Sequence, residues 1–339
     1  MPKSFTVKVK KLPGSLVEIE GEISAEEFAR HKEPALKKLG EKVSLPGFRR
    51  GHIPEAVLVK HAGEMELLEE MAELAIKKSY PDIIVECALN IIGFPEVKIT
   101  KLAFGNPLSF SLAVPVMPEI ILPDYKETAR EENGKMPEKT EVKGEEADAL
   151  LEELRKNFQK PEGGDEKEIK LNDEFARKIG DFKDLADLKE KAKEGISKEK
   201  EMKARDRRRL TILEEIIKET KIDLPEVIIN SELSKMTARF RGDIEETGMK
   251  FDEYLERAGK TEDDLRKEWR EDAKKRASFQ LILNKITSTE NIKADKDAVE
   301  KESAHILEHH PEINPLNARA YAEMILTNEK VFEFLENVK

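Results

Sequence analysis

Most of this chain follows a helical pattern, and that pattern constrains its fold more than any other feature. From Asn172 to the C-terminus, apolar residues recur at helical spacing, with capping residues at Asn172, Asp184 and Thr261 and only short turns between segments. Helices are predicted there over residues 172–180, 185–220, 225–247, 251–258, 262–287, 295–310 and 316–338. Because 39% of the residues are charged and only 6% are aromatic, much of the helix surface must stay solvated. This predicts an extended all-α domain of antiparallel helical hairpins rather than one compact globule.

The first 112 residues have a different pattern. Alternating apolar and polar side chains predict strands over 5–10, 16–23, 96–104 and 107–116. The segments between them predict helices over 24–39, 54–63, 64–80 and 81–90, with breaks at Pro34 and Pro81. This order predicts an α+β N-terminal domain with an antiparallel sheet that ends near residue 112.

One short loop, Pro46-Gly47-Phe48-Arg49-Arg50-Gly51-His52-Ile53-Pro54, lies between two of these helices. Gly47 and Gly51 permit positive φ and the prolines fix φ, so the loop has a defined shape. A Phe at a loop tip is poorly placed to enter a core, which makes Phe48 a candidate contact residue. The guanidinium groups of Arg49 and Arg50 can form bidentate hydrogen bonds with phosphates or carboxylates. The residues alone leave a second interpretation open, in which Phe48 folds back onto the core between solvated arginines.

The pattern Gly-Phe-Arg-x-Gly-x-x-Pro in residues 47–54 resembles the signature loop of the trigger factor family, bacterial chaperones that dock at the ribosomal exit tunnel. The order of the N-terminal elements resembles that family too, and the resemblance covers residues 1–160 and 171–339. It implies that Gly47, Phe48, Arg49, Arg50 and Gly51 bind the ribosome. The chain departs from the family at Arg50, where Lys is common, and at His52, where a basic residue is frequent.

Residues 113–171 are rich in Pro and in charge, and we expect a linker there with one short helix over 145–158. The trigger factor family usually carries an FKBP-type prolyl isomerase domain at this point. Only ten residues lie between Lys160 and Leu171, whereas a folded domain needs at least ~50. We therefore expect the isomerase domain to be absent and the protein not to be an enzyme. The expected domains are residues 1–112, 113–171 and 172–339.

Charge and composition narrow the choice of partners. The net charge of −11 argues against a general nucleic-acid binder. Residues 1–112 hold 16 Lys and Arg against 16 Asp and Glu, so a basic site in that part would be local. No stretch approaches the ~18 apolar residues of a membrane helix, and the single Cys87 excludes an internal disulfide. We expect a soluble cytoplasmic protein that binds neither DNA nor a membrane.

The resemblance also implies two helical arms, over 225–289 and 292–339, whose apolar faces hold unfolded chains. The candidate client-binding residues are Met236, Phe240, Met249, Phe251, Trp269, Tyr321, Met324 and Phe332. Periodicity does not separate an open binding face from ordinary packing inside each hairpin, so both interpretations stay open. His305 and His309 have the i, i+4 spacing of a metal site, although a solvated helix end is favoured. We expect no metal and no cofactor.

The expected function is that of an ATP-independent, ribosome-associated chaperone for nascent or unfolded polypeptides. Its docking partners would be the exit-tunnel protein and ribosomal RNA, and a homodimer is left open. Two alternatives come from other classes. A peptidyl-prolyl isomerase by family descent would catalyse proline-limited refolding. A helical scaffold would bind one folded partner and would not protect unrelated unfolded chains.

Overall fold

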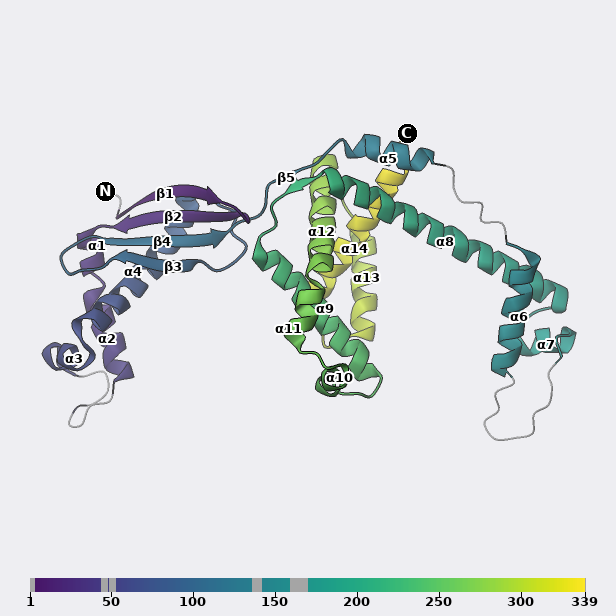
Figure 1. Cartoon of the computed structure of the whole chain (residues 1–339), viewed down its shortest axis with the longest axis horizontal. Helices are drawn as coiled ribbons and strands as arrows, with labels where there is room; N and C mark the ends of the chain where they lie inside the picture. Colours follow the sequence, from purple (N-terminus) through teal and green to yellow (C-terminus); the bar gives the residue numbers. More distant parts are fainter. Residues whose placement is uncertain (1–3, 44–47, 49–52, 136–141, 159–169, 339) are drawn as a thin grey trace. The chain divides into compact units, whose positions relative to one another are not determined.

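The computed structural model describes residues 4–43, 48, 53–135, 142–158 and 170–338 (Figure 1). The chain divides into two compact units. The first holds Met1–Ile121 with Lys221–Leu281, and the second holds Leu122–Thr220 with Ile282–Lys339. Each unit is thus assembled from segments far apart in the sequence. The three consecutive domains expected from the sequence stay a prediction.

An antiparallel sheet opens the first unit, in the strand order β1-β2-β4-β3. Its strands are β1 (Phe5–Leu12), β2 (Leu16–Ile23), β3 (Glu96–Lys101) and β4 (Leu108–Pro115). The apolar face of the sheet packs against α4 (Glu64–Cys87) (Figure 1). The other helices of the domain pack against α4: α1 (Ala25–Ala29), α2 (Lys32–Lys42) and α3 (Glu55–Ala62). Ile19, Met71 and Phe110 lie at the centre of the shared core and are at most 1% exposed. The predicted α+β domain is confirmed.

Two helices of this domain differ from the prediction. The predicted helix over 24–39 is broken before Lys32 rather than at Pro34, because Pro34 falls in the first turn of α2, where its missing N–H would be unpaired in any case. α4 runs straight through Pro81. Pro81 has no N–H to donate to the carbonyl of Lys77, which is an exposed residue, while buried Ile76 and Ile83 keep both halves packed on the core.

The first unit continues with a helical hairpin. The short strand β5 (Ile120–Ile121) pairs with β6 (Lys221–Ile222), and four helices follow: α9 (Glu226–Glu246), α10 (Phe251–Ala258), α11 (Glu262–Glu268) and α12 (Arg270–Glu290). Ile229, Leu233 and Ala273 join α9 to α12. The predicted helix over 262–287 is interrupted at Trp269, where ψ is 0°. We call α9–α11 with α12 up to Leu281 the first arm.

The second unit is all-α. Its helices are α5 (Tyr125–Gly134), α6 (Gly144–Phe158), α7 (Asp173–Ile179), α8 (Leu185–Glu219), α13 (Lys296–His309) and α14 (Pro315–Glu336). α8 has 35 residues, or about 50 Å at 1.5 Å per residue. α6 and α7 form a small core with the start of α8 through Leu151, Phe175 and Leu188. α13 and α14 pack together (Figure 1), and we call this pair the second arm.

One element of this unit was not predicted. α5 lies where the sequence suggests an extended linker, and it packs against α8 and α14. Among the helices that the structure describes, none is long and apolar enough to cross a membrane.

Candidate functional site

Phe48 lies between α2 and α3, and 41% of its surface is exposed. Val43 and Ile53, on either side of it, are partly buried against the core of the sheet domain. The chain is therefore anchored to the core before and after Phe48, while the ring stays accessible. This exposure does not fit the alternative in which Phe48 folds back onto the core. Gly47, Arg49, Arg50 and Gly51 lie outside the described residues, and their role stays a prediction.

A buried carboxylate fixes the helix that leads into this loop. Glu70 on α4 is 6% exposed and forms ion pairs with Lys38 and Lys42 of α2, with 2.8 Å between Lys42 Nζ and Glu70 Oε2. Burial raises the pKa of the Glu70 carboxyl, but hydrogen bonds from the two lysines outweigh burial and lower it below its ordinary value. At the far end of the loop, Lys32 Nζ lies 2.7 Å from Glu55 Oε1 and joins the starts of α2 and α3.

Three predicted client-binding residues of the first arm, Phe240, Phe251 and Trp269, form an aromatic cluster with Tyr254, which was not predicted. The Phe240 ring lies edge-on to three others, with centroid distances of 5.3 Å to Tyr254, 5.3 Å to Trp269 and 6.2 Å to Phe251. Phe251 is 3% exposed and lies under the Arg241 guanidinium, 4.6 Å from the ring centroid. Phe251 is thus a packing residue of the hairpin.

One side of this aromatic cluster remains open to a hollow. Met236, Phe240 and Trp269 line it and are all partly exposed. Its other lining side chains are charged: Arg239, Asp243, Asp272 and Arg276. Met249 is partly buried and does not line this hollow. The hollow therefore offers an apolar floor with a charged rim.

The second arm carries the more exposed apolar face. Tyr321 is 54% exposed and Met324 is 37% exposed, as an open binding face requires. Leu316 and Ile325 share the N-terminal half of α14 and are 76% and 38% exposed. Sequence reasoning missed these two, although their spacing from Tyr321 and Met324 places all four on one broad side of the helix. Ala318 and Ala322 of the same helix are buried.

Phe332, the remaining candidate on α14, lies under α8 instead. The Arg209 guanidinium is 5.0 Å from its ring centroid. Arg209 also donates two hydrogen bonds to Glu329, at 2.9 and 2.6 Å, and its Nε lies 2.8 Å from Glu336 Oε1. Arg205 pairs with Glu336 as well, at 2.7 Å. These contacts fix the base of the second arm to α8.

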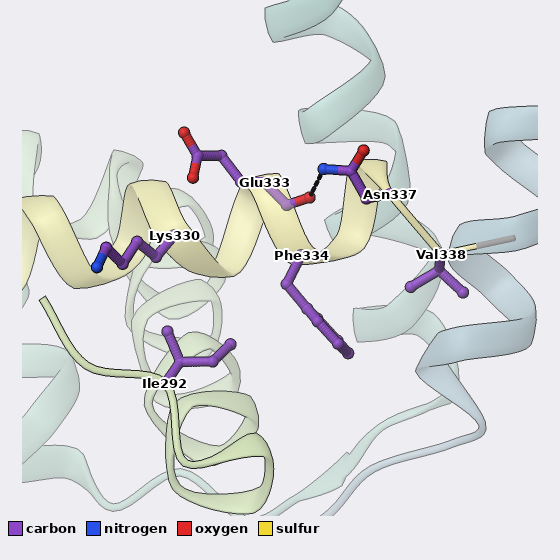
Figure 2. Close-up of a pocket in the computed structure, with 6 residues that line it drawn as sticks. All are labelled: Ile292, Lys330, Glu333, Phe334, Asn337 and Val338. Carbon is purple, nitrogen blue, oxygen red and sulfur yellow. Dashed lines mark hydrogen bonds between the residues drawn. The ribbon is translucent and has the colours of Figure 1, made fainter.

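A further hollow of about 410 Å³ lies at the C-terminal end of α14 (Figure 2). Ile292, Phe334 and Val338 supply apolar side chains to it, and Lys330 and Glu333 lie at its edge. Asn337 Nδ2 donates a hydrogen bond to the Glu333 carbonyl oxygen at 2.7 Å, which caps the end of the helix. Half of the lining residues are apolar, so its chemistry fits an apolar contact.

His305 and His309 lie together on α13, with ring centroids 4.7 Å apart. Both are exposed, and the described residues contain no group of three or more His, Cys, Asp or Glu side chains placed to hold a metal ion. Cys87 is a free thiol, partly buried against the core of the sheet domain, and burial raises its pKa. A thiol with a raised pKa is a poor nucleophile.

Two family models match this chain. The model described as "Bacterial trigger factor protein (TF)" matches residues 5–154. The model described as "Bacterial trigger factor protein (TF) C-terminus" matches residues 184–336. Only residues 155–183 lie unmatched between them.

Curated relatives agree with both models. The trigger factor of Halalkalibacterium halodurans is 24% identical over 88% of this chain and 89% of the relative. The trigger factor of Caldicellulosiruptor bescii is 25% identical over 98% of this chain and 96% of the relative, in an alignment of 423 residues. Since this chain has 339 residues, at least 84 residues of that relative have no counterpart here.

A solved structure described as "Promiscuous Substrate Recognition in Folding and Assembly Activities of the Trigger Factor Chaperone" covers 98% of this chain and 100% of that chain. Its TM-score is 0.58 and its sequence identity is 16%, which supports the fold. The two family models together account for most of the chain between Phe5 and Glu336, in N-terminal to C-terminal order. This protein therefore belongs to the trigger factor family.

Proposed function

We propose that this protein is an ATP-independent, ribosome-associated chaperone that binds nascent or unfolded polypeptides. The observation that carries the proposal is the exposed Phe48 in the signature loop of a trigger factor chain. Phe48 would act as the apolar anchor in a ribosomal crevice. Arg49 and Arg50 would pair with ribosomal RNA phosphates or with carboxylates of an exit-tunnel protein, in a salt-dependent way. Since nascent chains emerge where ribosomes translate, we infer the cytoplasm as its location.

Co-sedimentation with ribosomes tests the docking step. Phe48→Ala should weaken sedimentation, and the triple variant Phe48→Ala, Arg49→Ala, Arg50→Ala should abolish it, while circular dichroism stays unchanged. Phe104→Ala is the matched control, because Phe104 is 42% exposed against 41% for Phe48 and lies in the same domain. Sedimentation of the triple variant at the wild-type level would refute docking through this loop.

For client binding we favour two surfaces among the eight candidate residues. One is the open side of the Met236, Phe240 and Trp269 cluster, and the other is the face of α14 around Tyr321 and Met324. Apolar side chains that stay exposed in a folded protein mark interaction sites when they are contiguous. Phe251 and Phe332 are engaged by Arg241 and Arg209, so we assign them to packing.

We further propose that this chain has no isomerase domain and no enzymatic activity. The 29 residues at 155–183 are fewer than the ~50 that a folded domain needs. α7 and part of α6 already occupy this interval. The relative from Caldicellulosiruptor bescii is longer by about a domain, as expected if such a domain is missing here. A proline-limited refolding assay tests this, and acceleration well above the uncatalysed rate would contradict it.

A further inference from the structure

The turn between β1 and β2 contacts the segment that leads into the first arm. Asp223 stands just before α9, and its Oδ2 accepts hydrogen bonds from the backbone N–H groups of Gly14, at 2.5 Å, and Ser15, at 3.1 Å. In return, Ser15 Oγ donates to the Asp223 carbonyl oxygen at 2.6 Å. Three hydrogen bonds therefore join residues more than 200 positions apart, all within the first unit. We call this group of contacts the Asp223 clasp.

The backbone of the turn is shaped for this contact. Gly14 and Ser15 both have positive φ, 77° and 48°. For Ser15 this is an uncommon conformation, because its Cβ crowds the following carbonyl. In this conformation both N–H groups reach one carboxylate oxygen, and hydrogen bonds to a charged acceptor are stronger than neutral ones. The hydrogen bonds of the clasp thus offset the unfavourable positive-φ conformation of Ser15.

Three further contacts surround the clasp. β5 pairs with β6, with Ile120 opposite Ile222, immediately before Asp223. A Cβ built on Gly93 would lie 2.8 Å from Pro115 Cγ, so glycine lets this segment pass close to the end of β4, and Val227 of α9 lies at ordinary contact distance from the same position, 3.4 Å. The Val116 N–H also donates to the Ser15 carbonyl oxygen at 2.9 Å, which ties the same turn to the chain that leaves β4.

We infer that Asp223 is a positioning residue that holds the first arm in a fixed orientation on the sheet domain. The inference rests on the proposed function in one respect. The sheet domain carries Phe48, so a fixed joint lets docking through Phe48 also set the direction of the first arm. Asp223 is exposed, so its contribution is to orientation, and neither the sheet core nor the arm core depends on it.

A distance measurement tests the joint directly. Spin labels on cysteines at Lys98, in β3, and Glu245, near the end of α9, report the sheet-to-arm distance by pulsed electron resonance in a Cys87→Ala background. Asp223→Ala should broaden the distance distribution. Asp223→Asn keeps one acceptor oxygen for the Gly14 and Ser15 N–H groups and should stay close to wild type. Asp252→Ala, an exposed aspartate on α10, is the control and should change nothing.

A second assay measures chaperone activity apart from the sheet-to-arm distance. Asp223→Ala should sediment with ribosomes like wild type but should shield ribosome-tethered nascent chains from protease less well. An unchanged distance distribution in Asp223→Ala would overturn the inference, as would a broadened distribution with undiminished shielding. Ribosome sedimentation of the Phe48 variants is a separate measurement. If those variants sedimented like wild type, the proposed docking would be contradicted, and the distance measurement on Asp223 would be unaffected.

Discussion

The ion network at the base of the second arm yields the sharpest quantitative prediction. Glu336 is the last residue of α14, where the helix dipole disfavours a negative charge. Burial would raise its pKa further, yet hydrogen bonds from Arg205 and Arg209 lower it from 4.5 to about 2. The two arginines must therefore stabilise the Glu336 carboxylate by more than burial and the dipole oppose it.

The size of this effect follows from the pKa. A change from 4.5 to about 2 corresponds to ~3 kcal/mol. Arg205 is about half exposed, and Arg209 keeps Glu329 as a partner when Glu336 is lost, so solvent screening and this second pair reduce the net value. We expect Glu336→Gln to lower the free energy of unfolding of the second unit by about 1–2 kcal/mol at pH 7.

The pH dependence separates charge from packing. The folded-state pKa lies below the unfolded value, so this stabilisation is present above pH 4.5 and is lost as the pH falls towards 2. Urea unfolding followed by circular dichroism should show a deficit for Glu336→Gln at pH 7 that shrinks at pH 3. Glu333→Gln, an exposed neighbour on the same helix, should stay within ~0.5 kcal/mol of wild type throughout. An equal deficit at both pH values would refute an electrostatic origin.

Three further predictions separate packing residues from contact residues. Phe251→Ala should destabilise the first arm by about 3–4 kcal/mol, since Phe251 is 3% exposed, and hydrogen exchange in α9 and α10 would report this. The double variant Tyr321→Ala, Met324→Ala should protect an unfolded client from aggregation less well, while its thermal unfolding temperature shifts little. An equal loss of protection in Phe251→Ala, at a temperature where that variant stays folded, would contradict the assignment of Tyr321 and Met324 to client binding. Asn172→Ala should cost ~1 kcal/mol in urea unfolding, because the Asn172 side chain caps α7 through the Phe175 N–H at 3.0 Å; no change would show that the cap is dispensable.

Local signals in the sequence predicted most element ends correctly. Asp184 caps α8, which begins at Leu185 as predicted. The helix ends at Glu219, one residue before the predicted end at Thr220. The expected cap at Thr261 forms, and Asp264 completes a capping box with it. Such signals succeed because a cap is a contact between residues three positions apart and needs no knowledge of the tertiary fold.

Predictions failed where tertiary packing overrides local chemistry. Pro81 was expected to divide a helix, but buried residues on both sides hold α4 in one piece. α5 was missed because its segment is charged and flanked by prolines, and the surface that stabilises it comes from α8 and α14, far away in the sequence. For Phe251 and Phe332 the sequence left packing and contact open, because periodicity identifies an apolar face without showing what covers it, and the Arg241 and Arg209 contacts favour packing.

The small core shared by α6, α7 and α8 bears on how a domain can be added to this chain or removed from it. Leu151, Phe175 and Leu188, one from each helix, are each at most 3% exposed, so the helices on either side of residues 159–169 bury one another's apolar surface. This core is formed by contacts among α6, α7 and α8, and the entropy of closing a connection grows only slowly with its length. An isomerase domain inserted between α6 and α7 would then be a detachable module, because the contacts that join these two helices to α8 do not include it.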